Sequence, residues 1–180
     1  GKMKLVFADI LRELKASGYQ VSARLLNAMY FGVPQSRERM IFIGVRGDLR
    51  VAPSHPQAES APMILRNVLH GADVSGLPDF NDSYARLWKK IPVPRGQQLA
   101  SSAAHVIGKG FNSCVKPNPN MPCCTLLKTQ TGRGFATIAR WDEERALSVG
   151  EAKRIGSFPD RFSLIGNYST QWMRIGNSVP

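Results

Sequence analysis

Two arginines separated by one residue are the side chains of this sequence best suited to chemistry. Arg37 and Arg39 flank Glu38 immediately before an apolar run. On an extended segment that enters a strand, alternate residues point to one face, so the two guanidinium groups would lie together. Each would then form paired hydrogen bonds to a phosphate or to a base carbonyl, and Gln35 would orient the preceding turn. The plainer alternative is a solvated Arg-Glu-Arg surface pair, which contributes little.

The charge of the chain favours a polyanion as the partner of these arginines. The 180 residues include 24 Lys and Arg but 13 Asp and Glu, a formal net charge of +11. This excess is typical of proteins that bind nucleic acid, although a solvated cationic surface would also produce it. With 43% hydrophobic and 21% charged residues, the composition is globular. No apolar run approaches the roughly 20 residues of a membrane helix, so disordered, collagen-like and membrane-spanning classes are excluded.

The cysteines and histidines give no sign of a disulfide framework or a metal site. Cys114, Cys123 and Cys124 are an odd set without C-x-x-C spacing, and no secretory signal opens the chain. We therefore expect reduced thiols and a cytoplasmic protein. The three histidines are scattered without the spacing of metal ligands, and we expect no metal.

The elements that must position the arginines belong to an α/β sheet. Apolar residues at helical spacing predict an amphipathic helix over 5–15, which Gly18 would end. Residues 21–28 read as a strand, and 40–45 form a nearly all-apolar strand typical of a sheet covered on both faces. Two strands cannot form such a sheet alone, so we expect part of the fold to be missing and both termini to be cut.

After Gly47 the composition changes to a basic stretch with many prolines and weak periodicity. Residues 50–140 are expected to form a separate, loop-rich unit whose best strands are 125–128 and 135–139. A helix is then predicted over 148–157. Ser148 would be its N-cap, and Glu151, three residues later, would complete a capping box.

Two segments are specific enough to identify a family. The first is Asn-Ala-x-x-Phe-Gly-Val-Pro-Gln-Ser-Arg-Glu-Arg at 27–39. The second runs from Arg-Ala-Leu-Ser-Val-Gly-Glu at 145–151, through Phe-Pro-Asp at 158–160, to Gly-Asn-Ser-Val-Pro at 176–180. In type, order and spacing they resemble the eighth, ninth and tenth conserved motifs of the cytosine-5 DNA methyltransferases. The resemblance is strong in these segments. In the stretch between them it depends only on position along the chain and on general composition.

The resemblance implies a fold and a division into domains. Residues 1–49 would be C-terminal sheet elements of the catalytic domain, the trailing edge of a Rossmann-like methyltransferase sheet. Residues 50–140 would be a smaller, loop-rich, mixed target-recognition domain. Residues 141–180 would be a closing helix region that returns to the catalytic domain.

By the same resemblance, Arg39 would reach the flipped cytosine, where a cation near O2 stabilises charge that develops on the ring. Arg37 would support the site or the nearby phosphate. Asn177 and Ser178 match family residues that contact the cofactor S-adenosylmethionine. A simple Gly-Asn turn is the alternative for that pair.

The resemblance also implies contacts with duplex DNA. Thr125 matches the threonine of the family's Thr-Leu element, which meets the DNA backbone near the flipped base. Lys128 and Arg133 belong to Lys-Thr-Gln-Thr-Gly-Arg-Gly, a mixture suited to reading major-groove edges and phosphates, although a solvated turn can have the same composition. Lys109 and Lys116 are candidates for phosphate contacts.

Several family segments do not occur in the chain. These are the Phe-x-Gly-x-Gly cofactor loop, the Pro-Cys-Gln loop with the nucleophile, and the Glu-Asn-Val segment. Pro122-Cys123 is no substitute, because Cys124 stands in place of Gln and the pair follows the eighth motif.

We therefore expect a C-terminal fragment of a DNA (cytosine-5) methyltransferase, inactive without its N-terminal catalytic half and able to self-associate through its orphaned sheet edge. A non-catalytic DNA-binding specificity subunit or regulatory module is the alternative.

Overall fold

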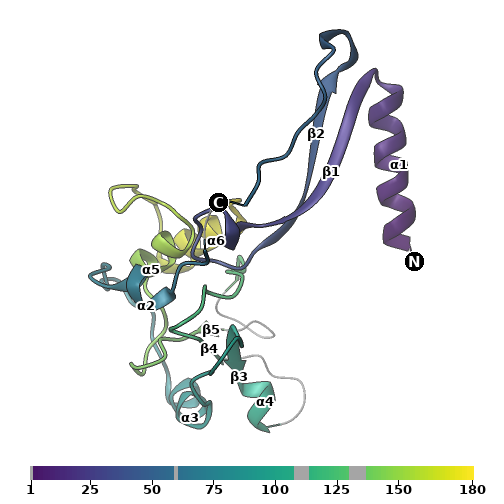
Figure 1. The fold of residues 1–180 in the computed structure, drawn as a ribbon. Coiled ribbons are helices and arrows are strands. Elements are labelled where there is room, and N and C mark those ends of the chain that lie inside the picture. Colours follow the sequence, from purple (N-terminus) through teal and green to yellow (C-terminus); the bar gives the residue numbers. More distant parts are fainter. Residues whose placement is uncertain (1, 59–60, 108–113, 130–136) are drawn as a thin grey trace. The chain divides into compact units, whose positions relative to one another are not determined.

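The computed structural model describes residues 2–58, 61–107, 114–129 and 137–180. The chain divides into two compact units. Unit 1 consists of Gly1–Asn27 and Glu38–Glu59, and unit 2 of Ala28–Arg37 and Ser60–Pro180. Figure 1 labels their elements, and each unit is described by itself.

Unit 1 is one helix beside a two-stranded sheet. Helix α1 (Lys2–Ala16) lies along β1 (Tyr19–Asn27), which pairs antiparallel with β2 (Glu38–Arg46) along its whole length (Figure 1). The rings of Phe7 and Phe42 pack with their centroids 5.6 Å apart. A 3-10 turn, η2 (Gly47–Leu49), follows β2. The predicted helix and both predicted strands are thus confirmed, with boundaries shifted by one to three residues.

The apolar residues of unit 1 are not enclosed by unit 1 itself. None of residues 6–27 and 38–58 is buried, and Leu25 is 56% exposed. The expectation that β2 is covered on both faces is therefore not met within this unit. One helix and two strands provide too few elements to surround a core.

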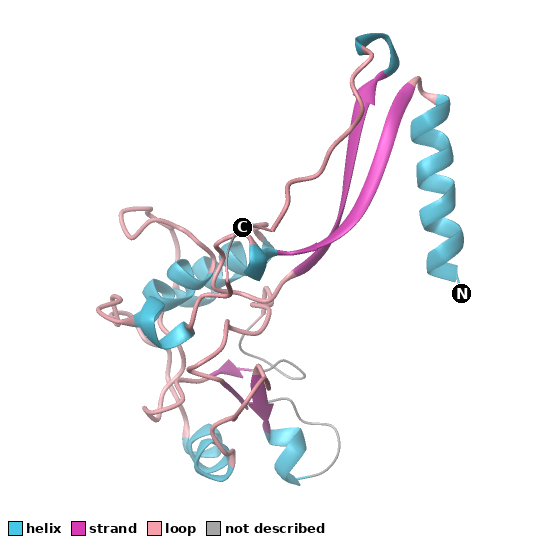
Figure 2. Ribbon diagram, viewed as in Figure 1, coloured by secondary structure: helices cyan, strands magenta, loops and turns pink. Residues whose placement is uncertain are grey.

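Unit 2 is a loop-rich assembly of short elements, as Figure 2 shows. It contains η1 (Ala28–Tyr30), α2 (Leu65–Leu69), α3 (Asp82–Lys90), β3 (Ala100–Ser102), α4 (Ala103–Ile107), β4 (Cys114–Pro117), β5 (Thr137–Ile138), α5 (Val149–Ile155) and α6 (Tyr168–Asn177). Strand β4 is central, antiparallel to β3 and parallel to β5. In the described parts of the chain, no helix has both the length and the apolar character needed to cross a bilayer.

Two apolar clusters hold unit 2 together. The larger joins α2, α5 and α6 and includes the fully buried side chains of Leu65, Leu126 and Trp172. The indole Nε1 of Trp172 also donates to the carbonyl of Leu127 at 2.9 Å. In the smaller cluster, Tyr84, Leu87 and Trp88 of α3 pack against buried residues that include Ile91, directly after α3, and Cys114 of β4. Residues 60–140 and 141–180 therefore form one packed unit, and the assignment of 50–140 to target recognition stays a prediction.

The strand predicted at 125–128 is wrong. Only Cys123 makes a bridge, to Gln35, and the residues after it are irregular. Side chains take the place of a partner strand, because the carbonyls of Leu126 and Leu127 accept from Arg37 and Trp172. Of the strand predicted at 135–139, Thr137–Ile138 is β5, and 135–136 lie outside the described residues.

The helix predicted at 148–157 is confirmed as α5, with both hydrogen bonds of its capping box. Glu151 is fully buried; besides the capping-box bond from the backbone N–H of Ser148 at 2.8 Å, it accepts from Arg140 at 2.6 Å and Arg145 at 2.8 Å. Burial alone would raise the pKa of Glu151, but the hydrogen bonds from Arg145 and Ser148 outweigh it, so the pKa is lowered. One carboxylate thereby holds the segment 140–148 against α5.

Replacing Glu151 by Gln should destabilise the protein by on the order of 3 kcal/mol, because two nearly buried guanidinium groups lose their counter-charge. A lowered folded pKa means that this stabilisation is present above the ordinary value of 4.5 and is lost as the pH falls through the folded value. In urea unfolding, the free energy of unfolding of Glu151→Gln should therefore be well below that of the wild type at pH 7. This difference should become smaller in acid.

The matched control for this substitution is Asp160→Asn. Asp160 pairs with Arg154 at 2.7 Å, but its side chain is 62% exposed, so solvent screens the pair and the expected loss of stability is much smaller than for Glu151. Equal losses from the two substitutions would contradict a structural role for Glu151.

Gly176 is required by close backbone packing. A Cβ at this position would lie within 3.0 Å of the backbone of Leu127 and Lys128. Gly176→Ala should therefore lower the stability by about 2 kcal/mol, in the range of overpacked sites, although alanine favours helices. Thermal melting measures the effect, and Asn177→Ala on the exposed neighbouring residue is the control. An unchanged melting temperature in Gly176→Ala would show that the two segments separate freely.

Candidate functional site

Gln35 is the centre of a buried polar cluster in unit 2. Its side-chain oxygen accepts from the backbone N–H of Leu126 at 3.0 Å, and its amide donates to the carbonyl of Ile155 at 3.4 Å. The backbone on either side of Gln35 pairs with Cys123, through Cys123 N–H to Pro34 at 2.9 Å and Ser36 N–H to Cys123 at 2.8 Å. These contacts fix the backbone on both sides of Gln35, and its role in orienting the turn for a site stays a prediction.

Arg37 is the second member of this cluster. It is 5% exposed, and its guanidinium donates to the carbonyls of Leu126 at 2.9 Å and Gly176 at 3.0 Å, and to Gln35 Oε1 at 3.4 Å. Gly176 is in the last turn of α6, where carbonyls lack helical partners and the helix dipole favours a cation. We call Gln35, Arg37 and these partners the Gln35–Arg37 cluster. Its geometry favours the supporting role of Arg37 over a phosphate contact.

Arg39 has a different setting. It is the second residue of β2 in unit 1, half-buried, and its Nη1 donates to the carbonyl of Glu38 at 2.6 Å. That Arg37 and Arg39 point to one face of a segment entering a strand stays a prediction. Strand β2 begins at Glu38, so Arg37 precedes it and belongs to the other unit.

Thr125 lies beside the Gln35–Arg37 cluster, where its Oγ1 donates to the carbonyl of Ser36 at 2.6 Å. Thr125 and Cys124 also line a cavity of about 400 Å³ together with Trp172. Lys128 is exposed at the end of the same segment. The predicted DNA contacts Lys109 and Arg133 lie outside the described residues.

Asn177 and Ser178 end α6. The side chain of Asn177 is exposed, while the Ser178 hydroxyl donates to the carbonyl of Ile175 at 2.6 Å. The hydroxyl oxygen can still accept hydrogen bonds, and the Asn177 amide can donate and accept. The pair therefore offers polar groups to a ligand at this helix end, directly after the Gly176 carbonyl that Arg37 holds.

Lys116 does not have the exposure that a phosphate contact requires, and that prediction is corrected. It is 4% exposed, with its Nζ 3.6 Å from the centre of the Trp88 ring. Burial lowers the pKa of Lys116. The amine is thus a cation packed on an aromatic face inside the unit.

The cysteines are free thiols. Cys123 is fully buried, and its hydrogen bond with the Cys124 thiol together with burial raises the pKa of Cys123. Burial raises the pKa of Cys114 to about 11. A buried protonated thiol is a poor nucleophile, in keeping with the interpretation of Pro122-Cys123 as an ordinary loop segment. Among the described residues, no group of His, Cys, Asp and Glu is arranged to hold a metal ion.

Two organising residues were not identified from the sequence. Glu151 was predicted only as part of a cap, although its pairing with Arg140 and Arg145 could have been suspected from their closeness in sequence. Asn118 is 1% exposed and holds the loop at 96–99 through three hydrogen bonds to its carbonyls, while its side-chain oxygen accepts a fourth from the N–H of Asn120. Its place between two prolines was the signal, because Asn side chains bond backbone in turns.

This chain is similar to known proteins in sequence and in fold. Residues 2–180 match the family C-5 cytosine-specific DNA methylase. The Type II methyltransferase M.AplI of Arthrospira platensis is 31% identical over 99% of this chain and 49% of its own length. M.BspRI of Lysinibacillus sphaericus is 30% identical over 97% of this chain and 44% of its own length.

A solved structure from E. coli, described as a DNA modification methyltransferase encoded within a prophage, is similar in fold with a TM-score of 0.62. It is 18% identical, and the similarity covers 91% of this chain and 57% of that one. The chain spans about half the length of the curated relatives that it matches. On the match of almost its entire length, the chain belongs to the C-5 cytosine-specific DNA methylase family.

Proposed function

We propose that the protein containing this chain transfers a methyl group from S-adenosylmethionine to C5 of a flipped cytosine in duplex DNA. The observation that carries the proposal is the Gln35–Arg37 cluster. It joins the segment at 34–37 to the segment at 123–126 and to the end of α6. In this arrangement one buried cation fixes three stretches that resemble the family's functional segments.

In the proposed reaction, a cysteine thiolate adds to C6 of cytosine, and C5 takes the methyl group while the donor sulfur leaves as a neutral thioether. Loss of the C5 proton to a base then breaks the bond between C6 and the thiolate and restores the ring. The N-terminal half of the enzyme would supply this thiolate, because the family's Pro-Cys-Gln segment does not occur in this chain. Arg39 would contribute a cation near cytosine O2, where it stabilises the negative charge of the adduct. Arg37 is a positioning residue in this scheme, since its guanidinium is occupied inside unit 2.

S-adenosylmethionine supplies an electrophilic methyl group when it is bound. Asn177 and Ser178 fit a minor part of such a site, because the exposed amide and the accepting hydroxyl suit the amino and carboxylate groups of an amino-acid ligand. The larger part of the cofactor site is assigned to the N-terminal half.

The target-recognition role is proposed for residues 50–140. Thr125 would meet the DNA backbone near the flipped base, Lys128 and Arg133 would meet major-groove edges and phosphates, and Lys109 would contact phosphate. The cytoplasmic location, self-association and the Rossmann-like setting of β1 and β2 also stay predictions.

The direct test is transfer of a labelled methyl group to cytosine-containing duplexes. The intact protein should methylate DNA, whereas the chain alone should show no transfer above background. If the intact protein bound duplex DNA specifically without transferring methyl groups, the non-catalytic specificity module would be the better description. Transfer by the chain alone that is lost in Cys123→Ser would overturn the proposed division of the site.

Substitutions in the intact protein should separate Arg39 from Arg37. Arg39→Ala should reduce the single-turnover rate by about 100-fold or more, the usual loss for a group that stabilises transition-state charge, with little change in melting temperature. Arg37→Ala should instead destabilise the fold by about 3 kcal/mol, because buried carbonyls lose their donor. Single-turnover kinetics and urea unfolding measure the two effects.

Arg46→Ala is the matched control for Arg39, since Arg46 ends the same strand and pairs with exposed Asp48. Arg46→Ala should change neither the single-turnover rate nor the free energy of unfolding by much. If Arg39→Ala kept the wild-type chemical rate, Arg39 would not be the residue that faces the cytosine.

A further inference from the structure

A groove in unit 2 carries cations that the proposed reaction does not use. Its volume is about 640 Å³, and it lies between α2, the loop at 92–98 and the turn at 119–120. Arg66 and Arg95 line it, together with the amide side chains of Gln98 and Asn120. No carboxylate is among the described residues that line it. The groove therefore offers hydrogen-bond donors of the kind that bind anions.

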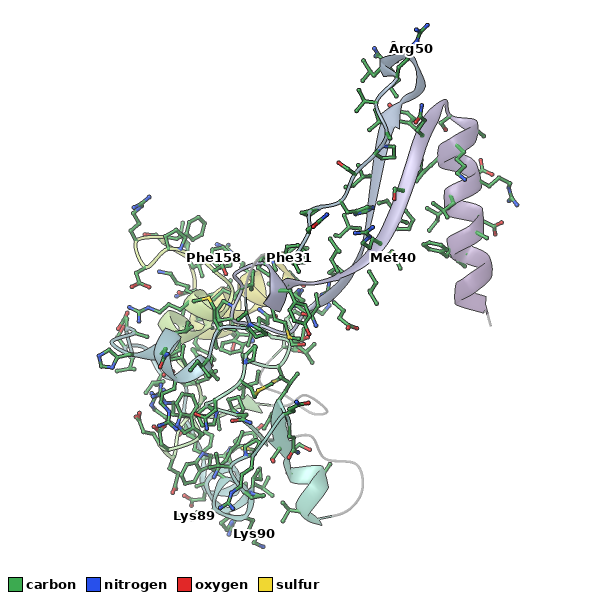
Figure 3. The ribbon with its side chains drawn as sticks, viewed as in Figure 1. Phe31, Met40, Arg50, Lys89, Lys90 and Phe158 are labelled. Carbon is green, nitrogen blue, oxygen red and sulfur yellow. The ribbon has the colours of Figure 1, made fainter. Side chains whose placement is uncertain are left out.

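The two arginines are exposed and available. Neither forms an ion pair with a residue in the described part of the chain. Nearby in sequence, Lys89 and Lys90 end α3, and Figure 3 shows both side chains at the outer surface. Lys89 is paired with Glu144 at 3.3 Å, but Lys90 adds a further exposed cation two residues before the groove begins at Pro92. Two exposed cations, Arg66 and Arg95, thus line the groove, and a third, Lys90, lies close to it in sequence.

The backbone that carries the arginines is fixed by Asn118. The buried amide of Asn118 donates to the carbonyls of Gly96 at 3.1 Å and Gln98 at 2.9 Å, and its oxygen accepts from the N–H of Asn120 at 3.0 Å. Gly96 has a φ of +58°, which allows the sharp turn directly after Arg95.

Arg66 is tied to the same turn. Its backbone N–H donates to the carbonyl of Pro119 at 2.9 Å. Both guanidinium groups thus project from backbone segments that are hydrogen-bonded to the 118–120 turn. A groove built in this way needs little rearrangement to bind a ligand, which favours affinity.

The lining of the groove distinguishes between anions. Its remaining surface comes largely from apolar residues, namely Pro92, Val93, Pro94 and Pro119. A free inorganic phosphate would gain nothing from these side chains. A strand of deoxyribose and phosphate has both an apolar sugar and charged oxygens, so it matches the apolar surface and the two arginines together.

We propose that this groove binds the sugar–phosphate backbone of duplex DNA, apart from the residues expected to read bases. The inference rests on the proposed function, because it takes DNA as the substrate. It extends that function by assigning Arg66 and Arg95 to contacts that position the duplex without reading its sequence.

The test measures the binding constant of the intact protein for a random-sequence duplex at several salt concentrations. A range of about 50 to 300 mM is wide enough to compare the slopes of log K against log[salt] between variants. Arg66→Gln and Arg95→Gln should each weaken binding by about 10-fold at the lower salt and reduce the slope of log K against log[salt] by about 0.9. The double variant should reduce the slope by about 1.8. A duplex with the target sequence should show the same changes.

The matched control is Arg161→Gln, which removes one positive charge from an exposed position of unit 2 outside the groove. Its slope should equal that of the wild type. If all three single variants lost affinity and slope equally, general charge would explain the effect and the groove would not be a site. If losses were confined to the target duplex, the groove would read bases and the backbone assignment would be overturned.

Failure of the proposed function is distinguishable from failure of the groove. A wild-type protein that neither binds duplex DNA nor methylates it would overturn both. A wild-type protein that methylates DNA while the groove variants behave as Arg161→Gln would overturn only the groove. Circular dichroism melting of each variant confirms that the fold is kept, and Gln98→Ala provides a neutral second probe, which should weaken binding about 3-fold without changing the slope.

Discussion

The burial of one guanidinium group, that of Arg37, is the constraint on which the arrangement of unit 2 depends. A buried cation loses its hydration, and this loss is offset only when its donors meet fixed acceptors. The carbonyls of Leu126 and Gly176 are such acceptors, at 2.9 and 3.0 Å. The second of them belongs to the C-terminal turn of α6, so the cation also satisfies a helix end. The planar fork of arginine reaches both carbonyls at once, which the single ammonium of lysine does less well.

The same solution recurs throughout unit 2 because its loops lack partner strands. Buried backbone groups must be paired, and in a loop-rich fold the donors have to be side chains. Gln35 donates to the carbonyl of Ile155, Trp172 to that of Leu127, and Asn118 to two carbonyls of the neighbouring loop. Each contact joins segments far apart in the chain. Side chains therefore perform in unit 2 the work that β-ladders perform in a regular sheet.

This explains which features could be predicted from the sequence. The helix at the start of the chain, the strands β1 and β2 and the capping box of α5 depend on neighbours within a few residues, so their patterns were sufficient. The strand expected at 125–128 failed because Arg37 and Trp172, distant in sequence, satisfy its carbonyls. No pattern of neighbouring residues in the sequence indicates that Lys116 is buried against Trp88. The motifs located the candidate site, but they did not reveal that Arg37 lies inside a unit while Arg39 lies on a strand of the other.

The position of Arg37 also bears on how the proposed activity would be coordinated. Each carbonyl that accepts from its guanidinium adjoins a residue with a proposed ligand contact, since Leu126 follows Thr125 and Gly176 precedes Asn177. One buried cation therefore holds the proposed DNA side and the proposed cofactor side in a common frame. A displacement of the guanidinium by a fraction of an ångström would be passed to both, because each backbone segment is fixed by further hydrogen bonds of Gln35 and Trp172. The methyl-transfer geometry would then depend on a residue that touches neither DNA nor cofactor, which is the expected behaviour of a positioning residue buried behind a site.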